Sequence, residues 1–459
     1  MSLHCDDSLP AAKTPGGAPA LASPATAVAS RDVAGDRRRV RDLVELRTTR
    51  RGFLAGGAAA VSAARLPASA PAAGVGDRAV VAIQVEGGWD YLSALVPAGH
   101  WAYQEARPNL RIPRSAVLDV EAGWDWYWHP SLWPFRDLYN RGDLAIVENV
   151  GYPTPDLSHF ESIKKWHAGD PTVGAFHSGW MGRYLSTAYT GLSPLPALDI
   201  EPYPSPVFAG YRVPAVLDAG TLNLNFDWNS PEDSAVGRLA LEAGTAYSEM
   251  VETGLVGEVA ARAAHAHRFA NALRELGRSY APRASYPNTG LAQELQLAAR
   301  YLSAGVPIQV FHLKTSGFDT HSLQAQRNDP AQGLFASLIG DLSAAVKAFL
   351  DDMSAWGRAN DVVVLLYSEF GRRVSENGAL GTDHGHGSVM FLAGAPVVGG
   401  RYGQTPDLAA LHRPNESYYI PFDARSTDFR RVYATILERW FQVASDPILG
   451  GSFAPLNAL

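Results

Sequence analysis

Five short, mainly apolar segments constrain the fold of this chain more than any other feature of its sequence. They are AVVAIQV (79–85), LAIVENV (144–150), PIQVFHL (307–313), DVVVLLY (361–367) and SVMFLAG (388–394). Helical segments separate several of them, an order typical of buried parallel strands with helices on both faces of the sheet. The sequence therefore predicts an α/β fold with a doubly wound, mostly parallel sheet.

Helical periodicity dominates residues 232–303, where the succession of strands is interrupted. We interpret this stretch as a helical insertion in a single α/β domain that spans residues 74–459. The last clear element is STDFRRVYATILERWF (426–441), which begins with residues that commonly cap helices.

Residues 1–73 differ from the rest of the chain. Arg50 and Arg51 precede a short stretch rich in Gly and Ala, and small residues follow it. This order is typical of a twin-arginine export signal that is cleaved near Ala70 or Ala73. It predicts a periplasmic or extracellular protein with the twin-arginine translocation machinery as a partner. An amphipathic N-terminal helix is the alternative interpretation.

Neither a stable membrane span nor nucleic-acid binding is expected. The apolar part of the leader is too short and too rich in glycine to span a bilayer, and no other segment reaches eighteen apolar residues. The first 73 residues carry ten Lys or Arg and six Asp or Glu, so the net charge of −7 for the whole chain leaves −11 for the remainder. Such an acidic domain argues against a nucleic-acid partner. The single cysteine, Cys5, excludes disulfides and thiolate metal sites.

Polar side chains that could bind a cation gather at the ends of the five predicted strands. In chain order these are Asp90, Ser158, Asp319 with His321, Glu369 with Arg372 and Arg373, and Asp383 with His384 and His386. Ligand-handling groups of open α/β sheets lie just past the carboxyl ends of the strands. Carboxylates and imidazoles in this number suit one or two divalent cations, most naturally zinc or manganese.

Chemical roles follow from these residue types. Ser158, at a helix start and next to cations, is suited to be a nucleophile because both would stabilise its alkoxide. The two arginines suit a tetrahedral oxyanion, although an ion pair with Glu369 is the alternative. The histidines of DHGHG are the strongest single indication of a metal, because histidines among loop glycines have little to pack against.

Taken together, the motifs RRGFL, GGWDYL, GFDTHS, SEFGRRVSENG and GTDHGHGSVMF resemble the exported bacterial family labelled domain of unknown function 1501. That family is in turn similar to the alkaline phosphatase and sulfatase superfamily, whose metal-binding core is a doubly wound α/β sheet. The resemblance implies that Asp90 is the first metal-binding aspartate and that Ser158 is the nucleophile, with Thr154 as the second choice. It also implies metal-binding roles for Asp319 and His321.

Some ligands depart from the superfamily pattern. Its later Asp-His step corresponds here to Glu369 and Phe370, so a metal-binding histidine is replaced by phenylalanine. The step between the aspartate and the histidine of GFDTHS is also shorter than usual. The last histidine is implied at His386 or His384, and Asp383 or His384 could supply the lost ligand. A site for a single metal ion is therefore one expectation.

The hypothesis is an exported, metal-dependent hydrolase that acts on a small-molecule phosphate or sulfate ester. The alternative is a non-catalytic exported binding protein that keeps the fold, and Phe370 favours it. A carbohydrate-directed role of GWDWYWHP (123–130) is a third interpretation, although packing is the more common role of such aromatic residues. The family has no settled activity, so the resemblance predicts a fold rather than a reaction.

Overall fold

The structure is a computed structural model, and it describes residues 78–189, 196–201, 204–211, 215–216 and 280–459. The predicted twin-arginine signal and residues 232–279 of the predicted insertion lie outside these ranges. Among the helices of the described ranges, none combines the length and the apolar character that a membrane span requires.

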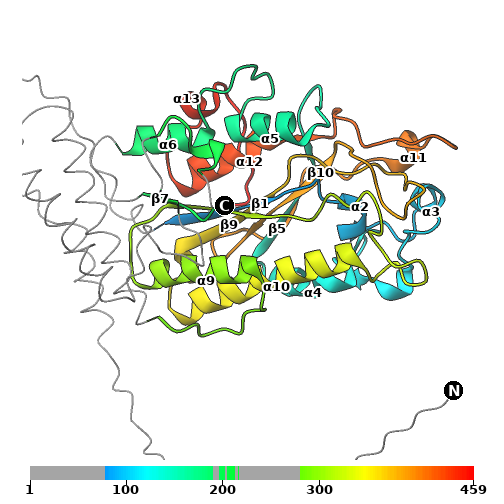
Figure 1. Ribbon diagram of the computed structural model, residues 1–459, viewed down its shortest axis with the longest axis horizontal. Helices are drawn as coiled ribbons and strands as arrows, with labels where there is room; N and C mark the ends of the chain where they lie inside the picture. The colour runs from blue at the N-terminus through cyan, green and yellow to red at the C-terminus, as the bar shows by residue number, and fades with distance from the viewer. Residues whose placement is uncertain (1–77, 190–195, 202–203, 212–214, 217–279) are drawn as a thin grey trace, which may run out of the picture.

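One large sheet lies at the centre of the described residues (Figure 1). Its strands are β1 (Ala79–Val85), β5 (Leu144–Gly151), β6 (Ala197–Asp199), β7 (Ala215–Val216), β8 (Val310–Thr315), β9 (Val362–Tyr367), β10 (Ser388–Ala393), β11 (Gly400–Tyr402) and β12 (Thr427–Asp428). They lie in the order β11-β5-β10-β9-β1-β8-β6-β7, and β12 also pairs with β5. Every neighbouring pair is parallel except the two that involve β10. The predicted mostly parallel sheet is confirmed.

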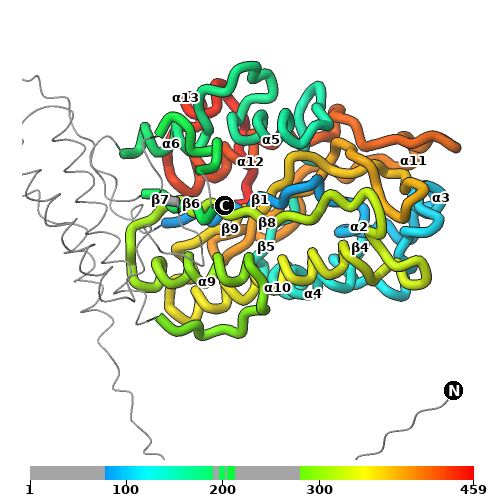
Figure 2. The backbone as a smooth tube through the Cα atoms, in the orientation of Figure 1, coloured from blue at the N-terminus to red at the C-terminus, as the bar shows by residue number. Residues whose placement is uncertain are grey.

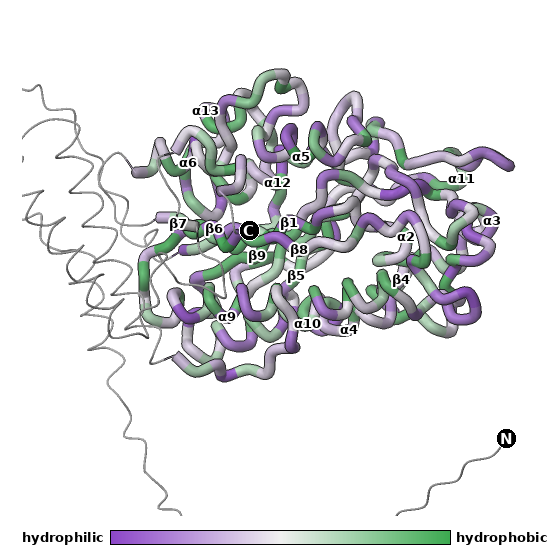
Figure 3. The backbone as a smooth tube through the Cα atoms, viewed as in Figure 1, coloured by the Kyte–Doolittle hydropathy of each residue, from purple (hydrophilic) through white to green (hydrophobic). Residues whose placement is uncertain are grey.

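The central strands are buried on both faces, as their apolar sequences predict. Along β1, Val81 and Ile83 pack on one side of the sheet, whereas Val80 and Ala82 pack on the other. Figure 3 shows that hydrophobic residues are concentrated in the strands at the centre of the molecule. β1 pairs with β8 on one side and with β9 on the other, although the three strands are far apart in the chain (Figure 2).

Helices cover both faces of the sheet (Figure 1). One layer contains α4 (Trp133–Asn140), α9 (Gly290–Ser303) and α10 (Leu334–Ala355). The other layer contains α5 (His159–Ala168), α6 (Trp180–Ala188), α12 (Phe429–Thr435) and α13 (Asp446–Leu449). Shorter helices are α2 (Tyr91–Ala94), α3 (Trp101–Ala106), α11 (Leu408–Leu411), the 3-10 turns η1 (Arg114–Ala116), η2 (Pro130–Leu132), η3 (Pro206–Phe208) and η4 (Ala359–Asp361), and the π-helical turn η5 (Ile436–Trp440). The two layers make the sheet doubly wound.

The C-terminal part of the predicted helical insertion belongs to one of these layers. α9 packs against α10, and its residues Leu295, Ala298 and Leu302 are buried in the core on that face of the sheet. Thr289 caps the start of α9 by accepting a hydrogen bond from the backbone N–H of Ala292. The described end of the 232–303 stretch is therefore core structure rather than a separate cap.

The tryptophan-rich segment is part of the hydrophobic core. It contributes β4 (Tyr127–Trp128) to a small sheet that β2 (Leu95–Val96) and β3 (Leu118–Asp119) complete. Trp124, Trp126 and Trp128 are each at most 8% exposed, and the first two stack on each other. These buried rings confirm the packing interpretation and leave no stacking surface for a sugar.

The direction of β10 decides which residues meet at the edge where the parallel strands end. Ser388, at the start of β10, pairs with Val150 near the end of β5, and Phe391 pairs with Leu366 near the end of β9. The segment before an additional parallel strand would lie at the opposite edge of the sheet. Because β10 is antiparallel, the DHGHG motif before it lies beside the residues that follow β1, β8 and β9.

Candidate metal centre

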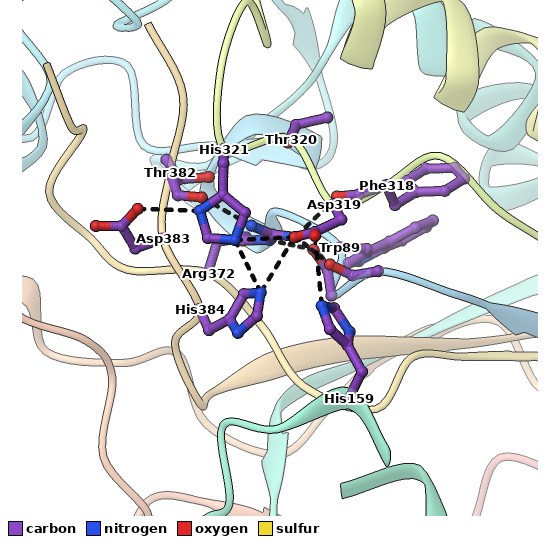
Figure 4. Close-up of polar contacts among 12 residues, drawn as sticks. Trp89, His159, Phe318, Asp319, Thr320, His321, Arg372, Thr382, Asp383 and His384 are labelled. Atoms are coloured by element: carbon purple, nitrogen blue, oxygen red, sulfur yellow. Dashed lines mark hydrogen bonds and ion pairs between the residues drawn. The ribbon is translucent and has the colours of Figure 1, made fainter. Parts of the chain in front are cut away.

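Side chains from separate segments meet at this edge of the sheet (Figure 4). Asp319 follows β8, His384 precedes β10 and His159 is the first residue of α5. One potential ligand atom of each lies within 4.8 Å of the others. His321 joins them, because its Nε2 atom lies 3.1 Å from Asp319 Oδ1 and 2.9 Å from Nε2 of His384. We call these four residues the Asp319 cluster.

Each histidine of the Asp319 cluster is anchored through its Nδ1 atom. The three hydrogen bonds run from His159 to Glu369 Oε1 (2.7 Å), from His384 to the carbonyl oxygen of Leu157 (2.8 Å) and from His321 to Asp383 Oδ1 (3.1 Å). Because these acceptors hold the Nδ1 protons, the Nε2 atom of each neutral ring carries a lone pair. Metal-binding histidines are commonly anchored through their second nitrogen by a carboxylate or a carbonyl in this way.

Three acceptor atoms of the cluster form a tight triangle. The Nε2 atoms of His321 and His384 are 2.9 Å apart, and each lies 3.1 Å from Asp319 Oδ1. Two neutral Nε2 atoms have no proton to share, and a carboxylate oxygen adds further negative charge. Such a group of lone pairs binds a proton or a metal cation.

Arg372 keeps Asp319 ionised. Its Nη2 atom donates a hydrogen bond to Asp319 Oδ1 at 2.6 Å. Partial burial acts to raise the pKa of Asp319, but the hydrogen bond and the charge of Arg372 outweigh it and lower that pKa to about 2. The second carboxylate oxygen, Oδ2, lies 3.5 Å from Nε2 of His159. Asp319 therefore links the three histidines as a charged group at neutral pH.

Glu369 positions His159 from the buried side. Its Oε1 atom accepts hydrogen bonds from the backbone N–H of Gly87 (2.8 Å) and from His159, and Oε2 lies 3.0 Å from the hydroxyl of Ser368. The hydrogen bond to Glu369 is the main reason why the pKa of His159 is raised. A Cβ on Gly87, where φ is +121°, would lie 2.3 Å from the backbone nitrogen of Asp319. The glycine therefore permits the close approach of the two strand ends.

Phe370, which stands where the superfamily pattern has a metal-binding histidine, forms an apolar wall of the cluster. Its ring centroid lies 4.9 Å from that of His159 and 4.7 Å from that of His384. The side chain is only 1% exposed. Phe370 therefore packs against the two imidazole rings and supplies no ligand atom itself.

Solvent reaches the Asp319 cluster. The side chains of Asp319 and His321 are 46% and 44% exposed, and those of His159 and His384 are 30% and 21% exposed. A structural metal site is normally closed by protein ligands, whereas a catalytic site keeps a position open. The exposure of this cluster is that of a site which a small molecule can approach.

The family assignment rests on a match that covers more than half of the chain. The family model described as "Protein of unknown function (DUF1501)" matches residues 145–449. The chain belongs to this family. A comparison with curated proteins finds no match for this DUF1501 protein.

Solved structures that are similar to this DUF1501 protein are distant. Ps i-CgsB in complex with k-i-k-neocarrahexaose has a TM-score of 0.35 at 10% identity, with 82% of this chain and 74% of that chain covered. The PsFucS1 sulfatase from Pseudoalteromonas sp. has a TM-score of 0.33 at 11% identity, covering 83% and 70%. The phosphonate monoester hydrolase SpPMH from Silicibacter pomeroyi has a TM-score of 0.32 at 10% identity, covering 83% and 78%. Likeness at this level says nothing about the reaction of the DUF1501 protein.

The predicted metal ligands divide into two groups in this DUF1501 protein. Asp319, His321 and His384 lie in the cluster itself. Glu369 and Asp383 lie directly behind it, each accepting a hydrogen bond from a cluster histidine. Five of the predicted ligands therefore gather at this edge of the sheet, and two of them, Glu369 and Asp383, accept hydrogen bonds from histidines of the cluster.

Asp90 lies outside the Asp319 cluster, contrary to its expected place as the first ligand. Arg107 donates to both of its carboxylate oxygens, at 2.7 and 2.9 Å, and Gln324 Nε2 donates at 2.6 Å. The hydroxyl of Ser93 and the backbone N–H of Leu92 also donate to it. Burial acts to raise the pKa of Asp90, but the charge and hydrogen bonds of Arg107 lower it. Its oxygens are thus already filled with donors.

His386 also lies outside the cluster, although only one residue separates it from His384. Its side chain is buried at 2% exposure, and Nε2 accepts a hydrogen bond from the backbone N–H of Tyr152 at 3.2 Å. Burial lowers the pKa of His386 to about 4. Of the two histidines that the resemblance offered for the last ligand, the structure brings only His384 to Asp319.

Neither arginine is available for the expected oxyanion. Arg372 is buried, and it donates to Asp319 and to the backbone carbonyls of Gly87, Gly88, Phe318 and Thr382. Arg373 Nη1 donates to the hydroxyl of Ser417 at 3.0 Å and its Nε donates to the carbonyl of His384 at 3.3 Å. Both guanidinium groups therefore hold loops together and position the cluster.

Ser158 lies beside the cluster at the N-cap of α5. Its side chain is exposed and makes no capping hydrogen bond. Its two chain neighbours both contact the cluster, because the carbonyl of Leu157 anchors His384 and the next residue is His159. Thr154, the second choice, is exposed and donates its hydroxyl to the carbonyl of Pro153.

His159 is the cluster member that the sequence pattern did not identify as a ligand. It directly follows the expected nucleophile and is the first residue of α5, so its position near a strand end could be predicted from the sequence. Its anchor, Glu369, lies 210 residues away in the chain. No local pattern links a histidine to such a distant carboxylate, and only the fold brings the pair together.

Proposed function

We propose that this member of the family is a metal-dependent hydrolase of small-molecule phosphate or sulfate esters. The observation that carries the proposal is the triangle of Asp319 Oδ1 and the Nε2 atoms of His321 and His384, with sides of 2.9 and 3.1 Å. The motif resemblance to the alkaline phosphatase and sulfatase superfamily supports ester hydrolysis as the reaction.

The donor set of the Asp319 cluster fits a zinc ion. Three imidazoles and one carboxylate match the ligands that zinc prefers, whereas manganese favours more carboxylate and water. Two atoms bound tetrahedrally at about 2.0–2.1 Å from one zinc ion lie roughly 3.3 Å apart. Neighbouring ligand atoms of the cluster are separated by 2.9–3.5 Å. The four cluster residues would hold the ion, and an ester oxygen would bind to it as an additional ligand. The ion would polarise that oxygen and favour ionisation of a nearby hydroxyl.

Ser158 is the proposed nucleophile. Its hydroxyl is exposed at the N-terminus of a ten-residue helix, where the helix dipole favours negative charge. In the proposed reaction, Ser158 Oγ forms a bond to phosphorus or sulfur while the bond to the alcohol oxygen breaks. The serine proton passes to water, and the alcohol oxygen takes up a proton from water. A water molecule then cleaves the serine ester, which releases phosphate or sulfate and restores the hydroxyl.

The test combines metal analysis with turnover of aryl phosphates and aryl sulfates. We expect about one zinc ion per chain, the number that one four-residue ligand set holds. Ser158→Ala should lower kcat by at least about a thousandfold, whereas Thr154→Ala, a matched loss of an exposed hydroxyl in the same loop, should change it less than about twofold. Wild-type turnover by Ser158→Ala would show that Ser158 is not the nucleophile. Absence of zinc after growth and purification with zinc would contradict the metal centre.

A non-catalytic binding protein is the second candidate, and the two arginines support it. Arg372 donates to carbonyl and carboxylate acceptors, and Arg373 donates to the hydroxyl of Ser417 and the carbonyl of His384, so neither offers a free guanidinium to a tetrahedral anion. This function would be favoured over hydrolysis if the protein bound zinc but hydrolysed none of the aryl phosphates and aryl sulfates. The same experiment should then also show no binding of vanadate or sulfate.

Export by the twin-arginine machinery to the periplasm or beyond also belongs to the proposal. The supporting observation is the RRGFL motif with the small residues after it. Replacement of Arg50 and Arg51 by lysine should leave the protein in the cytoplasmic fraction, where immunoblotting detects it. The chain with intact arginines should appear in the periplasmic fraction or the medium, and equal export of both chains would contradict the signal.

A further inference from the structure

A cavity of about 490 Å³ is lined by residues from the carboxyl ends of three neighbouring strands and from one face of α5. Glu86 directly follows β1, Lys314 lies near the end of β8, and Glu201 lies shortly after β6. Ligands of open α/β sheets bind just past the carboxyl ends of the strands, and cavities of roughly 300–1,000 Å³ are typical small-molecule sites. The position and the size of this cavity are therefore those of a site for a small organic molecule.

Apolar side chains form part of the cavity wall. Phe160 and Ile163 lie three residues apart on α5, so they share one face of that helix. Phe176, from the segment between α5 and α6, adds a second aromatic ring to the lining. The side chain of Phe160 is 85% exposed, so a ligand can reach its ring. Rings of this kind cover the apolar body of a ligand, and their faces also attract organic cations.

The charged side chains of the cavity lining leave one carboxylate without a partner. Lys314 Nζ lies 3.5 Å from Glu86 Oε1, and Lys164 forms an ion pair with Glu161, one turn earlier on α5. Within the part of the chain that the structure describes, Glu201 forms neither a hydrogen bond nor an ion pair. Because both lysines of the lining already have carboxylate partners, the cavity has an excess of negative charge at Glu201.

The environment of Glu201 makes its unpaired charge unfavourable. Partial burial raises the pKa of this carboxyl group, and the opposing charge of Lys314 does not offset the effect. Ser205, another residue of the lining, has no donor to spare, because its N–H and its hydroxyl both donate to Asp199. A cation within about 4–6 Å stabilises a carboxylate that is partly removed from water. A ligand that brings a positive charge into the cavity therefore supplies an interaction that the described residues do not.

We propose that this cavity binds an organic primary ammonium ion with an apolar body, and that the carboxylate of Glu201 accepts the hydrogen bonds of the ammonium group. Phe160, Ile163 and Phe176 pack against the apolar body. The inference does not depend on the proposed function, because no residue of the cavity lining is a member of the Asp319 cluster.

The test compares probes that share a phenyl ring and differ in charge, namely phenethylamine, phenethyl alcohol and phenylacetate. Each probe is titrated into the full chain at neutral pH, and ligand-observed NMR measures its affinity. We expect phenethylamine, which is a cation at this pH, to bind at least about fivefold more tightly than the alcohol, and phenylacetate to bind most weakly. Equal affinities of the amine and the alcohol, or tightest binding of phenylacetate, would overturn the proposal.

Two variants change the charge of the cavity in opposite directions. Glu201→Gln keeps the size of the side chain but removes its charge, so the affinity for phenethylamine should fall at least about fivefold while that for the alcohol stays within about twofold. Lys314→Met removes a competing cation, so the amine should bind about twofold to fivefold more tightly. Asp341→Asn removes an exposed carboxylate on α10, in the other helical layer, and should change neither affinity. An amine preference that survives in Glu201→Gln would overturn the proposal.

Two further measurements locate the bound amine. Phe160→Ala removes an exposed wall residue and should weaken both the amine and the alcohol about threefold. Zinc should leave the affinity for phenethylamine unchanged, because the cavity residues are not those of the Asp319 cluster. Displacement of the amine by zinc would place it at the cluster and would contradict the cavity assignment, as would unchanged affinities in Phe160→Ala. None of these titrations requires turnover, so a failure to hydrolyse esters would end the proposed function and leave this assignment standing.

Discussion

Two aspartates that follow neighbouring parallel strands of the same sheet have opposite environments. Asp90, after β1, is 1% exposed, and Arg107, Gln324, Ser93 and a backbone N–H fill its oxygens with donors. Asp319, after β8, is 46% exposed; Arg372 donates to its Oδ1, and the other groups around it are histidine nitrogens that carry lone pairs. We call the first group the Asp90 cluster. We expect a carboxylate with a matched set of donors to be structural and one among surplus acceptors to bind a cation.

The largest effect should come from removing a hydrogen-bond donor of the Asp90 cluster. Arg107→Met leaves the carboxylate of Asp90 buried without its counter-charge, and a broken buried ion pair costs about 3–5 kcal/mol. Urea unfolding should show this loss in the free energy of unfolding. Arg373→Met, which removes a guanidinium near the surface, should cost less than about 1 kcal/mol. Equal unfolding midpoints for the two variants would mean that the Asp90 cluster is not a stability element.

The second largest effect should come from removing a ligand of the Asp319 cluster. His384→Ala deletes one corner of the acceptor triangle, so zinc affinity should fall by at least about a hundredfold, since loss of an outer hydrogen-bond partner alone costs about 10–100-fold. Competition with a chromophoric chelator measures this affinity.

The matched control for that ligand is the histidine two residues further on. His386→Phe should leave zinc affinity within about twofold of wild type but should destabilise the protein by about 1–3 kcal/mol, because the buried N–H of Tyr152 loses its acceptor. A large loss of zinc affinity in His386→Phe, or none in His384→Ala, would reverse the assignment of the two histidines.

A smaller effect should come from the acceptor that anchors His159. Glu369→Gln keeps an oxygen for the Nδ1 hydrogen bond but removes the charge, and zinc affinity should fall about tenfold. The hydrogen bond and charge of Glu369 raise the pKa of His159. In the metal-free variant this pKa should therefore move down toward its ordinary value, as an NMR titration of the ring measures.

The pH dependence of zinc binding follows from the same interaction. A raised pKa means that His159 holds its proton at a higher pH than an ordinary histidine, and a protonated ring cannot bind metal. Zinc affinity of the wild type should thus be full above the pKa of His159 and should fall about tenfold for each pH unit below it. A flat profile between pH 8 and pH 5 would argue against His159 as a ligand.

The strands and the edge of the sheet were predictable because they depend on local patterns. Runs such as AVVAIQV and DVVVLLY can be buried only as central strands, and the polar residues after them must then lie at one edge. The direction of β10 was not predictable, since an apolar strand buried on both faces has the same composition in either direction. The place of the DHGHG motif at the edge that carries the Asp319 cluster depends on that direction.

The roles within the site depend on partners that are distant in the chain. Asp90 looks like a ligand from its position, but Arg107, from the end of α3, occupies it. Glu369 and His159 form one unit only because α5 passes over the end of β9. Residue type and strand position predict which side chains gather at the edge, while the balance of donors and acceptors, which decides their roles, appears only after folding.

The smallest effect should come from Asp383, which anchors His321 much as Glu369 anchors His159. Glu369 is buried at 1% exposure, whereas the side chain of Asp383 is 44% exposed. Water can replace an exposed acceptor, and the solvent screens its charge, so Asp383→Asn should lower zinc affinity only roughly twofold to threefold. The same chelator competition measures both variants. If Asp383→Asn lost as much zinc affinity as Glu369→Gln, the exposure of an anchoring carboxylate would not determine its effect on zinc affinity. The contrast between the buried Asp90 cluster and the exposed Asp319 cluster would then need another physical cause.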